Sequence, residues 1–193
     1  DPIYAAAEEL GVPACLHLLS ARTVGADRFD NFFLKHVFYA ADVFMAFSGI
    51  VAGGVLDRFP GLRVGVFEAG CGWIPYLMER MHEHWELFPD QLPELQHDPA
   101  ELMASDRCFY TFEPEEAAVP FVAGVIGEGR LMYASDYAHF DCMCPESLST
   151  IAGRERPATT CRQRSAGVQS SLSPASSRTG RSMPVSNCGL KPG

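Results

Sequence analysis

Short, uninterrupted apolar runs alternate with longer stretches of helical periodicity up to Glu146. The apolar runs are bounded by turn residues or charges, which predicts buried strands at 12–16, 63–67, 108–112 and 131–134. The intervening pattern predicts helices at 1–10, 29–57 and 114–127, a short helix from Asp98, and a helix after Gly72 with the apolar stripe Ile74, Leu77, Met78, Met81 and Trp85. Helices and strands therefore alternate along the chain.

The predicted strands are apolar without alternation, so we expect both faces of their sheet to be covered. This order and pattern indicate an α/β fold with a parallel sheet. Two architectures satisfy it, a doubly wound open sheet and an arc of a (β/α)₈ barrel. No Gly-x-Gly-x-x-Gly follows a predicted strand, so the sequence gives no indication of a dinucleotide or P-loop site.

The predicted helix at 29–57 contains a stretch with the composition of a membrane span. Residues 37–56 carry a single charge, Asp42. The stretch also includes the pair Gly53 and Gly54, lacks a flanking basic cluster and runs directly into a predicted strand. A helix buried against a sheet has the same composition. We adopt that interpretation, with no membrane as partner.

Charge and composition divide the chain at about residue 146. The 193 residues have a formal charge of −9 at pH 7, which argues against nucleic acid as a partner. Residues 147–193 are instead basic, rich in Ser, Arg and Pro, and free of aromatic residues. We therefore expect one folded domain at 1–146 and a disordered tail at 147–193. An out-of-frame reading of GC-rich DNA has the same composition as this tail.

The seven cysteines are odd in number and irregularly spaced, which argues against a disulfide framework. Cys142 and Cys144 are too close together for a zinc knuckle, and no paired histidines follow them. Reduced, partly buried thiols are typical of a cytoplasmic protein, the location we expect. No signal peptide is visible, because the chain begins without Met in an acidic predicted helix.

Polar side chains stand at the carboxyl ends of the predicted strands: His17, Glu68, Glu113 and Asp136. Catalytic groups gather at this edge in parallel α/β barrels, and His, Glu and Asp are ligands for zinc or manganese. Each residue alone has a structural explanation, as a loop hydrogen-bonding group, a helix-dipole partner or a turn residue. Their recurrence favours a site, and we expect His17, Glu68 and Asp136 to converge.

Two further residues are candidates for binding substrate or moving protons. His139 follows Asp136 in a loop that can fold over the site. Arg80 lies on the side of its helix that carries Trp73 and Leu77, where a half-buried ion pair is the structural interpretation and a substrate carboxylate the functional one.

The remaining histidines and serines give weaker indications of a functional site. Surface or core positions are expected for His36, His82 and His84. Ser20 and Ser135 lack the Gly-x-Ser-x-Gly context of a serine hydrolase.

Three motifs together carry a family resemblance: GVLDRFPGLRV from Gly54, EAGCGWIPYLMER from Glu68 and YASDYAH from Tyr133. The chain resembles amidohydrolase family 2, the aminocarboxymuconate-semialdehyde decarboxylase-like branch of the amidohydrolase superfamily, over about residues 1–146. The resemblance implies a (β/α)₈ barrel with a catalytic zinc or manganese ion. It also implies C–C cleavage of aromatic or muconic carboxylates, or hydrolysis.

The resemblance assigns roles residue by residue. His17 matches the metal-binding histidine of the family's strand five, and Asp136 matches the aspartate of strand eight. The decarboxylases have a further catalytic histidine after strand six, where this chain has Ala69 beside Glu68, as in a subgroup with Glu-x-Gly-x-Gly-Trp. The family's metal-binding pair on strand one has no counterpart, because the chain begins halfway round the barrel. The family's closing helices are also missing from the tail.

The sequence therefore predicts the C-terminal half of a metal-dependent hydrolase or decarboxylase, with strands five to eight of a partial barrel. His17, Glu68 and Asp136 are the expected metal ligands, and Asp136 and Glu68 also the proton acceptor and general base. Arg80 and His139 are expected to meet a small carboxylate substrate or its proton. A homo-oligomer is also compatible with the sequence. The alternative is a catalytically inactive half-barrel retained as a binding module.

Overall fold

The chain folds around a parallel four-stranded sheet. The computed structural model describes residues 1–18 and 28–154. The strands lie side by side in chain order, and every neighbouring pair is parallel: β1 (Ala14–Leu16), β2 (Val64–Val66), β3 (Cys108–Phe112) and β4 (Leu131–Tyr133). The predicted α/β fold and its four strands are confirmed.

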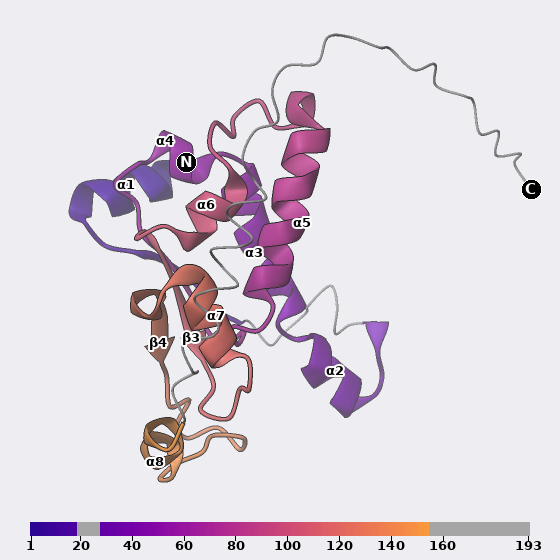
Figure 1. The fold of residues 1–193 in the computed structure, drawn as a ribbon, viewed down its shortest axis with the longest axis vertical. Helices are drawn as coiled ribbons and strands as arrows, with labels where there is room; N and C mark the ends of the chain where they lie inside the picture. The colour runs from indigo at the N-terminus through magenta and orange to yellow at the C-terminus, as the bar shows by residue number, and fades with distance from the viewer. Residues whose placement is uncertain (19–27, 155–193) are drawn as a thin grey trace, which may run out of the picture.

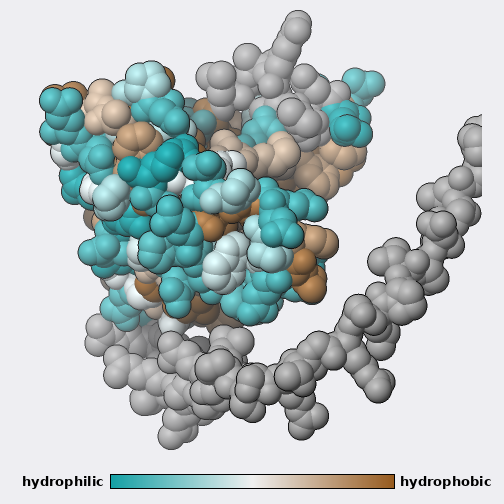
Figure 2. Space-filling model, turned by 90° about the horizontal axis from the view of Figure 1, so that it is seen from above, coloured by the Kyte–Doolittle hydropathy of each residue, from teal (hydrophilic) through white to brown (hydrophobic). Residues whose placement is uncertain are grey.

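Helices precede, connect and follow the strands (Figure 1). Their bounds are α1 (Pro2–Leu10), α2 (Phe32–Phe38), α3 (Ala41–Ala52), α4 (Val55–Arg58), α5 (Ile74–Leu87), α6 (Pro99–Ala104), α7 (Val119–Ile126) and α8 (Ser147–Ala152), with short 3₁₀ turns η2 (Pro89–Gln91) and η3 (Glu128–Arg130). Gly11 ends α1 in the left-handed conformation, where its N–H reaches the carbonyls of Ala7 and Glu8. The surface at the end of the molecule that holds α1 and α4 is mainly hydrophilic (Figure 2).

One face of the sheet forms the core with the helices. Val64 and Val66 of β2 pair in register with Cys108 and Tyr110 of β3, and all four are buried. The Tyr110 ring meets Phe47 of α3 edge-on, at 5.6 Å between ring centroids. Its hydroxyl donates to the carbonyl of Met103 at 2.7 Å, which satisfies the polar end of the buried ring. The same core includes buried side chains from α5, α6 and α7.

The opposite face of the sheet is less covered. Cys15 is exposed, and Phe109 and Met132 are half-buried. The guanidinium of Arg130 lies over the Phe109 ring, 5.3 Å from its centroid. The expectation that both faces are covered is therefore met on one face only among the described residues, because the helices of residues 28–154 pack on that side.

The predicted helix at 29–57 is broken into α2, α3 and α4. The break between α3 and α4 follows from Gly54, which is left-handed with φ of 63°. Within the described residues, Phe32–Ala52 is the one helical segment long and apolar enough to cross a membrane by length and composition. Its α3 portion buries Val43 and Phe47, with Ile50 and Val51, in the core.

The start of α7 differs from the prediction. The helix expected at 114–127 begins only at Val119. The Glu116 side chain accepts hydrogen bonds from the backbone N–H groups of Cys71, Gly72 and Glu113, which holds the preceding segment as a loop.

The expected tail at 147–193 also begins too early. Ser147 is buried and accepts a hydrogen bond from the Tyr133 hydroxyl at 2.7 Å, and α8 continues the fold to Ala152. Arg154 donates to the carbonyls of Pro114 and Glu116. Composition does not reveal polar contacts between residues that are this far apart in the sequence. The rest of the predicted tail, 155–193, lies outside the described residues.

Candidate metal centre

Four predicted site residues come together at the carboxyl edge of the sheet. His17 directly follows β1, Glu68 follows β2, and Asp136 and His139 follow β4. His17 Nε2 lies 3.1 Å from Glu68 Oε1, and His139 Nδ1 lies 2.8 Å from Asp136 Oδ2. One ligand atom from each of Glu68, Asp136 and His139 lies within 4.8 Å of the other two. This spacing suits a single ion with a shared ligand sphere.

The backbone at both carboxylates has an uncommon conformation. Glu68 and Asp136 have φ of 53° and 50°, in the left-handed region that side-chain-bearing residues seldom occupy. The Glu68 N–H donates to Thr111 Oγ1 at 3.0 Å, and the His139 N–H donates to the Asp136 carbonyl at 2.9 Å. Such conformations persist where surrounding contacts enforce them, and they cluster at functional sites.

The two histidines are oriented by their Nδ1 atoms. His17 Nδ1 lies 2.8 Å from the Leu18 carbonyl, so this nitrogen carries the hydrogen and Nε2 faces Glu68. His139 Nδ1 is held by Asp136, which leaves its Nε2 available. Fixing one ring nitrogen to set the direction of the other is the usual arrangement of metal-binding histidines.

The carboxylates alter each other's protonation. Burial raises the pKa of Glu68, and its contact with Asp136 raises that pKa further, since two adjacent carboxyls disfavour a second negative charge. The hydrogen bond from its ring to Asp136 raises the pKa of His139. A divalent cation among these groups would compensate the clustered negative charge.

Glu113, the fourth strand-end residue, lies beside this group. It follows β3, between the strands that precede Glu68 and Asp136. Burial raises its pKa to about 7, and the negative charges of Glu115 and Asp136 act in the same direction. A carboxyl that titrates near neutral pH is suited to general acid or base catalysis.

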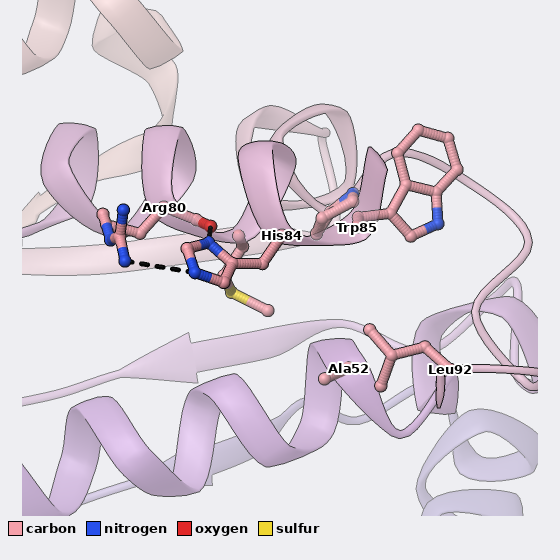
Figure 3. A pocket seen from close by; sticks show the side chains of 7 residues that line it. Ala52, Arg80, His84, Trp85 and Leu92 are labelled. Atoms are coloured by element: carbon pink, nitrogen blue, oxygen red, sulfur yellow. Dashed lines mark hydrogen bonds between the residues drawn. The ribbon is translucent and has the colours of Figure 1, made fainter. Parts of the chain in front are cut away.

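Arg80 is directed elsewhere. Its guanidinium contacts Glu83 Oε2 at 2.5 Å and His84 Nε2 at 3.2 Å on the surface of α5. Its side chain is 47% exposed, so the expected half-buried position is only partly met. With His84 it borders a hollow of about 310 Å³ whose other lining is mainly apolar, including Trp85 and Leu92 (Figure 3).

The other predicted histidines have structural partners. His82 Nδ1 contacts Asp98 Oδ2 at 2.7 Å, and the His36 ring packs against Phe32 and Phe140. Ser135 Oγ accepts from the Tyr137 N–H, and Ser20 lies outside the described residues. None of these contacts assembles a nucleophile with a base among the residues that the structure describes.

Two residues near the site were missed in the sequence. The sequence pattern predicts only that Thr111 lies in a strand and Glu116 in a helix. Thr111 is 5% exposed and is the one buried serine or threonine in the described strands. A polar residue inside an apolar strand was the available signal for Thr111, since a buried hydroxyl needs a partner. For Glu116 no local signal existed.

Comparison with known proteins identifies relatives of this chain. Residues 1–170 match the sequence model of the amidohydrolase family. The 2-amino-3-carboxymuconate-6-semialdehyde decarboxylase of Dictyostelium discoideum is 28% identical over 138 residues, which make up 70% of this chain and 37% of the relative.

Two solved structures share the fold. The 5-carboxyvanillate decarboxylase of Sphingomonas paucimobilis superposes with a TM-score of 0.68 at 20% identity, over 89% of this chain and 52% of that one. A dihydroxybenzoic acid decarboxylase of Polaromonas sp. JS666 was crystallised with manganese and the inhibitor 2-nitroresorcinol. It superposes with a TM-score of 0.63 at 14% identity, over 84% of this chain and 49% of that one. The chain thus spans between 37% and 52% of the length of these relatives.

Proposed function

The chain belongs to the amidohydrolase family, and from this premise we propose that it supplies part of the divalent-metal centre of an enzyme acting on a small aromatic or unsaturated carboxylate. The observation that carries the proposal is the convergence of His17, Glu68, Asp136 and His139 at one edge of the sheet. Decarboxylation is the favoured reaction, because the relatives described above are named as decarboxylases.

The sheet is, in this proposal, an arc of a (β/α)₈ barrel. Its strands follow chain order without the reversal that marks the switch point of a doubly wound sheet. The less covered face, with Cys15 and Phe109, is the face that lines a barrel interior. The share of the relatives that the chain spans is compatible with half a barrel.

The donor atoms fit a divalent ion such as manganese or zinc, both of which accept carboxylate oxygen and imidazole nitrogen. His17 Nε2 and Glu68 Oε1 are both acceptors when Nδ1 carries the hydrogen, so at 3.1 Å they repel unless a cation or a proton lies between them. We assign His17, Glu68 and Asp136 to hold the ion. When bound, the ion supplies Lewis-acid polarisation of a substrate oxygen.

His139 is assigned to proton delivery. In decarboxylation the bond between the substrate carbon and its carboxylate breaks, CO₂ leaves, and the electron pair left on the carbon takes up a proton. The His139 ring supplies that proton from Nε2, because its Nδ1 is held by Asp136 and the adjacent negative charge stabilises the protonated ring. Water then restores the proton to the ring.

Hydrolysis is the second candidate, and one residue favours it. Ala69 stands where the resembling decarboxylases have a catalytic histidine. Glu68 or Glu113 would then act as the general base toward water, since burial raises the pKa of each carboxyl toward the working range of such a base.

An assay with manganese and dihydroxybenzoic acid distinguishes the candidates. If the chain releases CO₂, and this activity is lost in Asp136→Asn but retained in the exposed control Asp90→Asn, decarboxylation is supported. Cleavage of an amide or ester of the same acid, with the same dependence on Asp136, supports hydrolysis instead. Neither product from manganese-loaded protein contradicts both reactions and favours a binding module.

A further inference from the structure

The turn that carries Glu68 is held from the neighbouring strand by Thr111. Thr111 Oγ1 accepts the hydrogen bond from the Glu68 N–H at 3.0 Å and lies 3.4 Å from the Val66 carbonyl, to which its hydroxyl donates. One buried hydroxyl therefore contacts both the last residue of β2 and the first site residue beyond it. It does so at the point where the Glu68 backbone turns into the left-handed region.

The far end of the same turn is held by Glu116. Its Oε1 accepts from the backbone N–H groups of Cys71 at 2.8 Å and Gly72 at 3.3 Å, and its Oε2 accepts from the Glu113 N–H at 2.9 Å. Gly70 packs closely here: a Cβ at this position would lie 2.6 Å from Glu116 Oε1, and its φ is 61°. The turn from Glu68 to Gly72 is thus fastened at both ends.

We propose that Thr111 is a positioning residue of the metal centre, which holds the Glu68 backbone in the conformation that directs its carboxylate to His17 and Asp136. The left-handed conformation is unfavourable for a residue with a side chain and must be enforced by its surroundings. When the hydrogen bond is lost, φ returns toward negative values, and this rotation moves the Glu68 Cβ and carboxylate relative to the other ligands.

The assignment rests on the proposed function, because it presumes that Glu68 is a metal ligand. It goes beyond that function by placing a determinant of metal affinity on β3, a strand that supplies none of the proposed ligands. Groups that orient ligands from outside the coordination sphere change metal affinity by roughly 10–100-fold when they are removed.

The test compares three variants of the full chain. Thr111→Val keeps the side-chain shape but has no acceptor, and Thr111→Ser retains the hydroxyl. Thr150→Val is the control, because it removes a hydroxyl in α8 that donates to the Glu146 carbonyl instead. Titration with manganese should show weakening of roughly 10-fold or more in Thr111→Val, with recovery in Thr111→Ser and unchanged affinity in Thr150→Val. The hydrogen-exchange rate of the Glu68 amide, measured without metal, should rise in Thr111→Val and return in Thr111→Ser.

The outcomes separate this inference from the proposed function. Unchanged manganese affinity in a folded Thr111→Val variant overturns the positioning role. A weakened affinity in Thr111→Val that is equally weak in Thr111→Ser overturns it too. Absence of manganese binding in the unmodified chain instead overturns the metal centre. The Glu68 exchange rate then still decides whether Thr111 holds this turn, since an unchanged rate in Thr111→Val contradicts the hydrogen bond itself.

Discussion

His17 Nε2 and Glu68 Oε1 lie 3.1 Å apart although they follow different strands, β1 and β2. The pairing arises from the parallel sheet, which places the carboxyl ends of adjacent strands at one edge. The hydrogen bond of His17 Nδ1 to the Leu18 carbonyl turns Nε2 toward Glu68. Secondary structure and one local contact therefore bring these two side chains together without a dedicated loop.

Metal affinity should fall toward acidic pH. Burial and the adjacent Asp136 raise the pKa of Glu68, so this carboxyl holds its proton to higher pH than an isolated carboxyl does. An ion held by Glu68 must displace that proton, so affinity falls by about tenfold per pH unit once the pH is below the Glu68 pKa. Calorimetric manganese titrations at pH 7, 5 and 4 measure this. Equal affinity at all three values contradicts the ligand assignment.

Glu113 should destabilise the fold as pH rises. Its pKa in the folded chain is about 7, above the 4.5 of a free glutamate side chain. The folded state therefore keeps a proton that the unfolded state releases, so stability is lost as pH rises from about 4.5 to 7. Glu113→Gln removes this loss. Its free energy of unfolding should exceed that of the unmodified chain at pH 8 by about 1 kcal/mol, allowing for solvent screening, and match it more closely at pH 5.

Urea unfolding at both pH values tests this claim, with the exposed Glu79→Gln as control. A stability gain in Glu113→Gln that is the same at pH 5 and pH 8 would rule out titration of Glu113 as the cause.

Arg154 should contribute to the stability of the fold. Its guanidinium donates to the carbonyls of Pro114 and Glu116 and so ties the segment after α8 to the loop that contains Glu116. Arg154→Ala leaves these partly buried carbonyls without their charged donor, which should cost about 1–3 kcal/mol of unfolding free energy. The exposed Arg28→Ala is the matched control and should change little. Equal stability of the two variants would contradict a structural role for Arg154.

The sequence predicts the sheet well because its strands are short apolar runs that end in polar residues. The β3 run at 108–112 matches the observed strand at both ends. The same pattern predicts that His17, Glu68 and Asp136 lie at one edge, since a parallel sheet brings strand ends together whatever the connecting helices do. Their shared edge is a consequence of topology, which apolar runs reveal.

Side-chain contacts that the pattern of residue types does not encode explain what could not be predicted. Arg80 has the residue type of a carboxylate-binding group, but Glu83 and His84 on its own helix satisfy its guanidinium. The late start of α7 depends on hydrogen bonds from Glu116 to Cys71 and Gly72, which no local pattern encodes. Composition likewise placed the tail boundary too early, because it does not show the contact between Ser147 and Tyr133.

The most direct test of the metal centre is the manganese and zinc stoichiometry of the purified chain, measured by calorimetric titration and elemental analysis. We expect one ion per chain, with affinity at least tenfold weaker in His17→Gln and Asp136→Asn. The matched controls His84→Gln and Asp90→Asn should bind as the unmodified chain does. Absence of binding to the unmodified chain, or undiminished binding in His17→Gln and Asp136→Asn, would contradict the proposed centre.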